Sequence, residues 1–228
     1  MREGQYLFGQ WSDDLHLGLL WSQAHPFPSS TKTPTWPQIP SWFWASLNAP
    51  VAWSEEYQPS DRHTNPRQLC KSIKPMTQPD SHATTLVGNL MRLRDDVQHQ
   101  ETRLISKAAG RIEIYSGALG RCDFEVDQWY FDSLEGKDDE TKTRSMLRTV
   151  FVIPLFHRDS QLVTCLVLLP LPTSGRGVFR RVGILHIHII SGRLRSDFTP
   201  MAQEYQKDIT ENFYQDCDGE GFYKISIV

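Results

Sequence analysis

The chain has 228 residues, of which 39% are hydrophobic and 22% are charged. This length fits one large domain or two small ones with a substantial core, and the composition excludes wholesale disorder. The net charge of −3 argues against general binding of nucleic acid, which depends on clustered lysine and arginine side chains.

The N-terminal part, residues 1–53, predicts a helix followed by a tryptophan-rich strand. Ser12 caps the helix, Asp13 and Asp14 suit the positive end of its dipole, and apolar residues follow at helical spacing up to Trp21. A connector rich in Pro, Ser and Thr, residues 26–40, forms a loop. The stretch WFWA from Trp42 would place apolar side chains on both faces of a strand, which indicates a buried strand that joins the core.

Residues 54–82 are mostly polar and carry four prolines, so we expect a loop with at most a short strand near 69–73. Residues 83–228 predict an antiparallel β module. Short strands are expected at 85–87, 90–93 (after an interruption at Gly88), 111–115 and 122–127.

The main element of that module is a meander. Three apolar runs joined by short turns predict consecutive neighbours at 149–156, 162–169 and 178–190. A helix from Thr199, with Pro200 at its first position, and a last strand near 222–228 close the chain. The predicted fold class is α+β, mainly antiparallel β with a sandwich- or meander-like sheet, plus an N-terminal and a C-terminal helix.

The cysteines indicate a reducing compartment. Cys70, Cys122, Cys165 and Cys217 lie far apart without a C-x-x-C pair, so we expect free thiols rather than disulfides or a zinc site. The first residues, MREGQYLFGQW, lack the apolar stretch of a signal peptide, and no apolar run is long enough to span a bilayer. We therefore expect a cytoplasmic protein that does not contact membranes.

Two histidines carry the main candidate for catalytic chemistry. His186 and His188 lie two residues apart on one face of a predicted strand, a spacing at which two imidazoles can bind one metal ion. His157 or the carboxylates near Asp123 would supply a third ligand. The simpler interpretation, an exposed or partner-facing histidine pair, is favoured because two histidines do not complete a metal site. We expect neither a metal nor another cofactor.

No motif of a self-contained enzyme occurs elsewhere. Asp123, Glu125 and Asp127 lack the glycine and the distal glutamate of an EF-hand loop, and SGRG at 174–177 lacks the lysine of a phosphate loop. The arginines of residues 176–195 are expected to lie under the acidic residues of 197–220, which again disfavours nucleic acid. The tryptophans favour a packed core over a stacking surface. The alternative is a small-ligand or metal-dependent enzyme that uses His186, His188 and an aromatic cleft.

Four stretches carry a resemblance to a known family. GQYLFGQWSDDLHLGLLW (4–21) and PSWFWASLNAPVAW (40–53) resemble the region downstream of the HET domain in fungal heterokaryon incompatibility proteins. LVLLPLPTSGRGVFRRVGIL (166–185) is similar to the long hairpin of that family with its R-V-G step, and KISIV (224–228) to its final strand. The residues that carry the resemblance are Trp11, Asp13, Asp14, Leu15, Gly18, Leu19, Leu20, Trp21, Pro40, Ser41, Trp42, Trp44, Ala45, Ser46, Pro50, Val51, Arg181, Val182 and Gly183.

The resemblance implies a link to non-self recognition and regulated cell death after fusion of unlike fungal cells. In the family this activity is attributed to the HET domain, which precedes the matching region and is absent from this sequence; Phe43 also stands where the family has serine. We therefore expect a truncated or regulatory, non-catalytic module. Its expected partner is a protein, either a HET-domain-containing N-terminal half or a full-length relative.

The predicted N-terminal helix also indicates a docking surface. Its apolar residues spread wider than the stripe of about 100° that covers one core face. We expect an exposed apolar patch at Leu17, Leu20 and Trp21, where the N-terminal half of a relative would dock.

Overall fold

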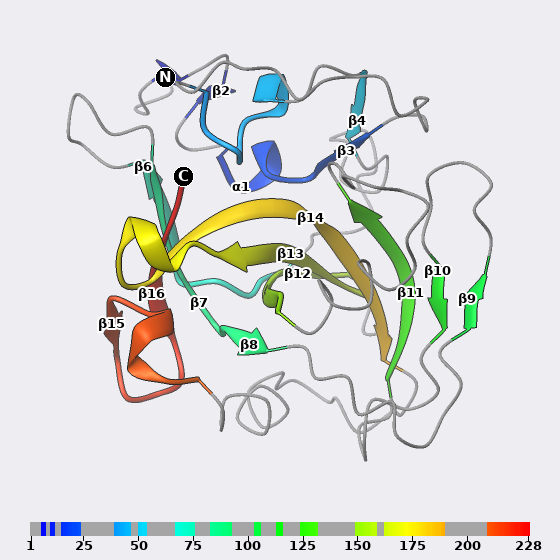
Figure 1. Cartoon of the computed structure of the whole chain (residues 1–228). Coiled ribbons are helices and arrows are strands. Elements are labelled where there is room, and N and C mark those ends of the chain that lie inside the picture. The colour runs from blue at the N-terminus through cyan, green and yellow to red at the C-terminus, as the bar shows by residue number, and fades with distance from the viewer. Residues whose placement is uncertain are drawn as a thin grey trace.

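The computed structural model describes residues 6–7, 10–11, 15–23, 39–46, 50–53, 67–75, 83–92, 103–105, 113–115, 124–131, 149–158, 162–189 and 209–228. Within these residues the chain is mostly β-strand with a few short helices, so the expected β-rich class is confirmed (Figure 1). None of the described helices has both the length and the apolar character needed to cross a membrane.

The elements before the meander are short. In chain order they are β1 (Tyr6–Leu7), β2 (Gln10–Trp11), α1 (Leu15–Gly18), β3 (Trp21–Gln23), the 3-10 helix η2 (Trp44–Ser46), β4 (Val51–Trp53), β5 (Arg67–Gln68), β6 (Ser72–Pro75), β7 (Thr84–Gly88), β8 (Met91–Arg92), β9 (Arg103–Ile105), β10 (Glu113–Tyr115) and β11 (Phe124–Phe131). The longer strands follow, with 3-10 turns between them: β12 (Phe151–Arg158), β13 (Leu162–Pro170), η4 (Pro172–Ser174), β14 (Val178–Ile189), η5 (Glu211–Phe213), β15 (Asp216–Cys217) and β16 (Tyr223–Ile227).

The predicted meander is confirmed. β12, β13 and β14 are consecutive antiparallel neighbours, because three apolar, β-branched runs are joined by connections too short for anything but a hairpin. β14 is the longest strand and crosses the molecule as one curved ribbon (Figure 1). Its last part pairs with β11, and its first two residues pair in parallel with β16.

The main sheet closes on itself. The strand order β12, β13, β14, β16, β7 returns to β12, because β8 follows β7 directly and pairs with the other edge of β12. β5 and β6 reinforce this closure by pairing with β12 and β7. Residues 67–75, predicted as a polar loop with at most a short strand near 69–73, therefore contribute two strands to the main sheet.

Side chains from every strand of the closed sheet meet inside it. Leu86, Ile153, Leu166, Ile184 and Ile225 are fully buried and belong to one hydrophobic core. The interruption predicted at Gly88 marks a close approach in this core, since a Cβ atom there would lie 2.7 Å from Cγ2 of Ile153. Consecutive residues of β12 and β13 are buried, so both faces of these strands are covered.

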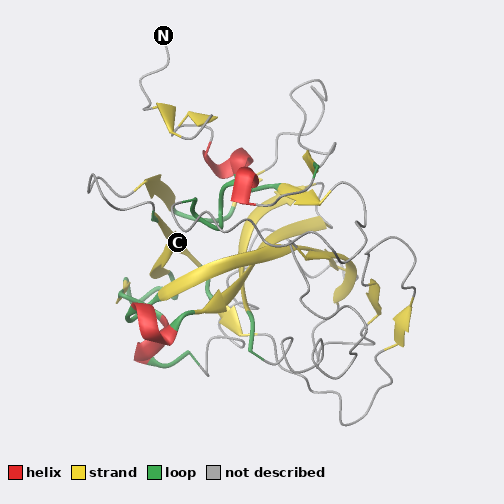
Figure 2. Cartoon of the chain, turned by 45° about the horizontal axis from the view of Figure 1, so that its top comes forward, coloured by secondary structure: helices red, strands yellow, loops and turns green. Residues whose placement is uncertain are grey.

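The N-terminal segment covers the sheet. Leu15, Leu19, Leu20, Trp42 and Phe43 are buried in the same core as the strands. Figures 1 and 2 show α1 and β3 together on one side of β14. We call residues 15–53 the cap, of which 15–23, 39–46 and 50–53 are described.

The predicted N-terminal helix is much shorter than expected. α1 ends at Gly18, and the chain then turns and enters β3 at Trp21, which pairs with Trp53 of β4. A helix of this length is only marginally stable by itself, so strand pairing overrides the helical pattern. The residue predicted to cap the N-terminus of this helix, Ser12, lies outside the described residues, as do Asp13 and Asp14.

The predicted tryptophan-rich strand is also wrong. Residues 41–46 form turns instead, with hydrogen bonds from Phe43 N to Pro40 O (3.0 Å) and from Ser46 N to Phe43 O (2.9 Å). The turn buries Trp42 and Phe43 together and directs Trp44 outward. Trp42, Phe43 and Trp44 are all aromatic, so the sequence shows no alternation of apolar and polar residues here that would distinguish a strand from a turn.

The end of the chain was predicted in part. The helix expected from Thr199 falls mostly on residues 190–208, which lie outside the described residues; from Ile209 onward only the 3-10 turn η5 appears, and no C-terminal helix is shown. The predicted final strand is confirmed as β16, which pairs with β14 and β7 inside the sheet.

Candidate functional site

Arg181 on β14 lies at the centre of a buried cluster. Only 2% of it is exposed, and its guanidinium carbon lies 3.5 Å from the ring centroid of Trp21. Its Nη2 donates a hydrogen bond to the backbone carbonyl of the same tryptophan. Guanidinium suits this position because its planar face can stack on an indole while its edge donates hydrogen bonds. Both contacts offset the cost of removing the charge from water.

Hydrogen bonds tie this cluster to two further segments. Trp21 Nε1 donates to the carbonyl of Trp42 at 3.0 Å, and the Ser41 hydroxyl accepts the backbone N–H of Arg181 at 3.0 Å. The same hydroxyl donates to the carbonyl of Val228, which also accepts the N–H of Ser41. β3, the tryptophan-rich turn, β14 and the segment after β16 are therefore fixed at one point. We call Trp21, Ser41, Trp42 and Arg181 the arginine cluster.

The arginine cluster collects residues from three of the stretches that carry the family resemblance. Trp21, Ser41 and Arg181 come from a different stretch each, and 140 positions separate Ser41 from Arg181. Of the other resemblance residues, Leu15, Gly18, Leu19, Leu20, Pro40, Val182 and Gly183 are buried, Ala45, Ser46 and Val51 are half-buried, and Trp44 and Pro50 are exposed. Trp11 lies in β2, whose side chains the structure does not describe.

The expected docking patch is wrong. Leu20 and Trp21 are 1% and 0% exposed, and half-buried Leu17 packs against the core. The prediction assumed a continuous helix, around which these side chains would point in different directions. Because the chain leaves the helix at Gly18, Leu20 and Trp21 turn inward from a turn and a strand instead.

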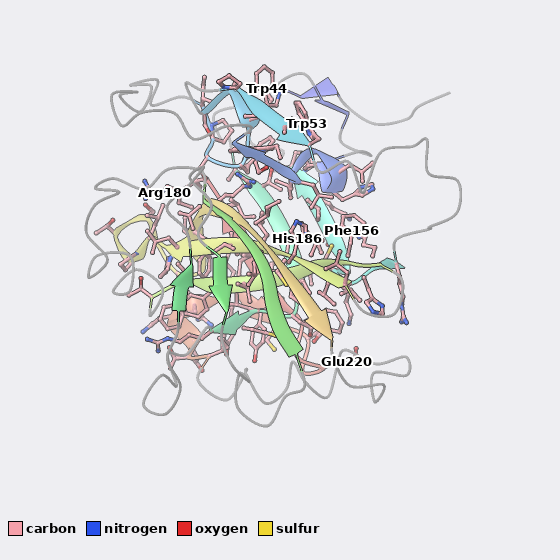
Figure 3. All side chains as sticks on the ribbon, turned by 90° about the vertical axis from the view of Figure 1, so that its right-hand side faces the viewer. Trp44, Trp53, Phe156, Arg180, His186 and Glu220 are labelled. Atoms are coloured by element: carbon pink, nitrogen blue, oxygen red, sulfur yellow. The ribbon has the colours of Figure 1, made fainter. Side chains whose placement is uncertain are left out.

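Two neighbouring tryptophans do reach the surface. Trp44 and Trp53 are 37% and 44% exposed, whereas the other large hydrophobic side chains described are less accessible. Their rings meet edge to face, with centroids 6.3 Å apart. Phe43 links them to the core, since its ring lies 5.2 Å from that of Trp44 and 6.2 Å from that of Trp42. Figure 3 shows the exposed tryptophan pair at the edge of the molecule, far from His186.

The histidines do not form the expected exposed pair. His186 is 4% exposed, and its Nδ1 is in hydrogen-bond contact with Thr164 Oγ1 at 3.0 Å on the neighbouring strand. This part of β14 lies between β13 and β11, which pair with its two edges, and an isolated strand pattern does not reveal these neighbours. The side chain of His188 lies outside the described residues, and His157 is half-buried on β12. Among the described side chains, His, Cys, Asp and Glu form no group of three or more that would hold a metal ion.

The described cysteines are free thiols, as expected. Cys70 and Cys165 are buried and Cys217 is half-buried, while Cys122 lies outside the described residues. Burial raises the pKa of Cys70 to about 11 and raises the pKa of Cys165 as well. A catalytic cysteine needs the opposite shift, because the thiolate is the nucleophile. These two thiols therefore serve as core residues.

Two acidic residues near the end of the chain, Asp218 and Glu220, pair with Lys71. Lys71 Nζ contacts Asp218 and, at 2.9 Å, Glu220, and it lies 4.2 Å from the ring centroid of Phe222. Burial alone would raise the pKa of Asp218, but hydrogen bonds from Lys71 and from backbone N–H groups lower it overall. Acidic residues of 197–220 were expected to pair with the arginines of 176–195, but Asp218 and Glu220 pair with Lys71 instead. Arg176 instead stacks on Tyr214 and donates to its carbonyl.

Comparisons with family models, with curated proteins and with solved structures find no match to this chain.

Proposed function

We propose that the chain is a non-catalytic, protein-binding module of the heterokaryon incompatibility type, which acts in the cytoplasm in fungal non-self recognition. The observation that supports this most is the arginine cluster. The stretches GLLW, PSWFWAS and RVG, on which the resemblance rests, meet in a single buried contact. Residues that recur together in a family need a shared physical reason, and this contact supplies one.

The proposed absence of catalysis rests on the chemistry of the described side chains. His186 is buried and engaged with Thr164, and burial raises the pKa of the Cys70 and Cys165 thiols instead of lowering it. An acid–base or nucleophilic residue needs access to substrate and a pKa suited to its task. The proposed partner is the one that the resemblance implies, namely a HET-domain-containing N-terminal half or a full-length relative.

Complex formation tests this function directly. The purified chain would be mixed with separately prepared HET-domain halves of heterokaryon incompatibility proteins, and binding would be measured by calorimetry and by co-elution. We expect a one-to-one complex with at least one of these halves. Failure of every half to bind at roughly 100 μM, where even a weak Kd in the micromolar range is detected, would reject the proposed partner.

The alternative function, a metal-dependent enzyme using His186 and His188, has a separate test. Metal content would be measured after dialysis for the wild-type chain and for the double variant His186→Ala and His188→Ala. The proposed function expects the same low metal content in both. Zinc, iron or manganese bound one-to-one and lost in the variant would support the enzyme instead.

A further inference from the structure

The exposed tryptophan pair, Trp44 and Trp53, lies in two described segments, 39–46 and 50–53, that carry no charged side chain. Among the described neighbours of the pair in sequence, Pro50 and Ala52 are also exposed and Ala45 is half-buried. No lysine, arginine, aspartate or glutamate occurs within the described segments 39–46 and 50–53. A ligand that covers this surface would leave any charge of its own without a partner here, so an uncharged ligand is favoured.

The exposed area limits the size of that ligand. A tryptophan side chain buries 150–250 Å² when it is fully covered, so exposures of 37% and 44% leave roughly 120–200 Å² for contact. A stable interface between two globular proteins needs about 800 Å² on each side. The two indole rings alone therefore supply only a fraction of such an interface, whereas their area matches one or two side chains of a short segment.

Strand β4 offers backbone groups beside the exposed tryptophan pair. It pairs with β3 along one edge, and within the described residues no strand pairs with its other edge. A free edge presents N–H and C=O groups to which an extended peptide can add as a further strand. The outer edge of β4 and the two indole rings thus supply the main-chain bonds and the apolar contact that strand addition requires.

The arginine cluster holds this surface in place. Trp53 pairs in register with Trp21, whose ring is stacked on Arg181, and Trp44 is linked through Phe43 to the buried Trp42. A surface held in this way loses little conformational entropy when it binds, which favours affinity from a small area.

We propose that the outer edge of β4 and the exposed tryptophan pair bind a short, extended, uncharged segment of a partner protein, with an aliphatic or aromatic side chain of that segment packed on Trp44 and Trp53. This inference rests on the proposed function and names its contact surface. The binding mode is strand addition, so the segment needs no fold of its own.

The test uses overlapping 12-residue peptides that cover the HET-domain half found to bind the full chain. We expect one apolar, extended peptide to bind, and we expect the double variant Trp44→Ala and Trp53→Ala to bind it and the whole half at least about tenfold more weakly. The variant Trp44→Phe and Trp53→Phe should retain most of the affinity. Amide exchange at 51–53 should slow when the peptide is bound.

Controls separate the possible failures. Because more than half of each tryptophan is buried, the double alanine variant should lose thermal stability, and circular dichroism at the binding temperature checks that it remains folded. Arg180→Ala, an exposed change on β14, should bind normally. If the wild-type chain binds the half and the alanine variant binds equally well, the contact surface is wrong while the proposed function stands. If no half binds the wild type, both fall. Self-association abolished by the alanine variant would identify a second copy as the occupant and overturn the inference.

Discussion

Two consecutive arginines on β14 have opposite environments. Arg180 is exposed, whereas Arg181 is buried against Trp21. The sequence pattern RRV does not distinguish them, and only the family resemblance singled out Arg181. Its partner could not be predicted, because Trp21 is 160 residues away and was expected in a helix.

This difference predicts unequal costs of substitution. Arg181→Ala removes a stacking contact and a charge-assisted hydrogen bond, and we expect it to lower the free energy of unfolding by about 2–4 kcal/mol. Arg180→Ala should change it by less than about 0.5 kcal/mol. Urea unfolding followed by circular dichroism measures both. Equal effects of the two substitutions would show that the arginine cluster does not stabilise the fold.

At the scale of elements, the turn between β13 and β14 depends on a neighbour distant in sequence. Gly177 has a φ of +66°. Its N–H donates a hydrogen bond to the carbonyl of Asn212 (3.1 Å), and its carbonyl accepts one from the N–H of Ser226 (2.8 Å). A Cβ atom at this position would lie 2.7 Å from Gln215 N, which is backbone and cannot rotate away. The glycine thus allows the turn to pack directly on the C-terminal segment.

Gly219 provides a matched control for this turn. It also has a positive φ, +79°, but a Cβ atom there would meet nothing within 4 Å. Gly219→Ala should cost about 1–2 kcal/mol from backbone conformation alone. Gly177→Ala should cost clearly more, because the clash adds to the same conformational cost. Thermal unfolding of the two variants compares them, and equal Tm values would show that the contact with Gln215 is not tight.

The elements that depend on neighbours close in sequence were predicted, and those that depend on residues distant in sequence were not. β12, β13, β14 and β16 were predicted because each apolar run and each short turn is local information. The turn at 41–46, the early end of α1 and strand β5 were missed, and the short strand allowed near 69–73 overlaps β6 only in part, because long-range pairing decides these elements. The burial of His186 was missed for the same reason, since it depends on contacts with other strands, such as the one with Thr164, and not on the alternation along β14.

At the scale of the whole molecule, the question is whether the cap is a separate unit. The sequence predicted residues 54–82 as a polar loop between the N-terminal part and the β module. In the structure, however, Leu15, Leu19 and Trp42 share one core with the strands, and part of that loop closes the sheet. A shared core leaves no boundary along which the cap could separate while its apolar side chains stay buried.

The cap and the sheet should therefore unfold together. In native-state hydrogen exchange, amides of 19–23 and of 162–169 should approach the same free energy of opening, that of global unfolding. The Arg181→Ala variant should loosen this coupling, because the arginine cluster fixes β3 and the tryptophan-rich turn to β14. In that variant the cap amides should exchange at a lower free energy than the amides of β13. If the cap amides already exchange much faster in the wild type, the cap is a separable unit, and the arginine cluster joins two parts that fold independently.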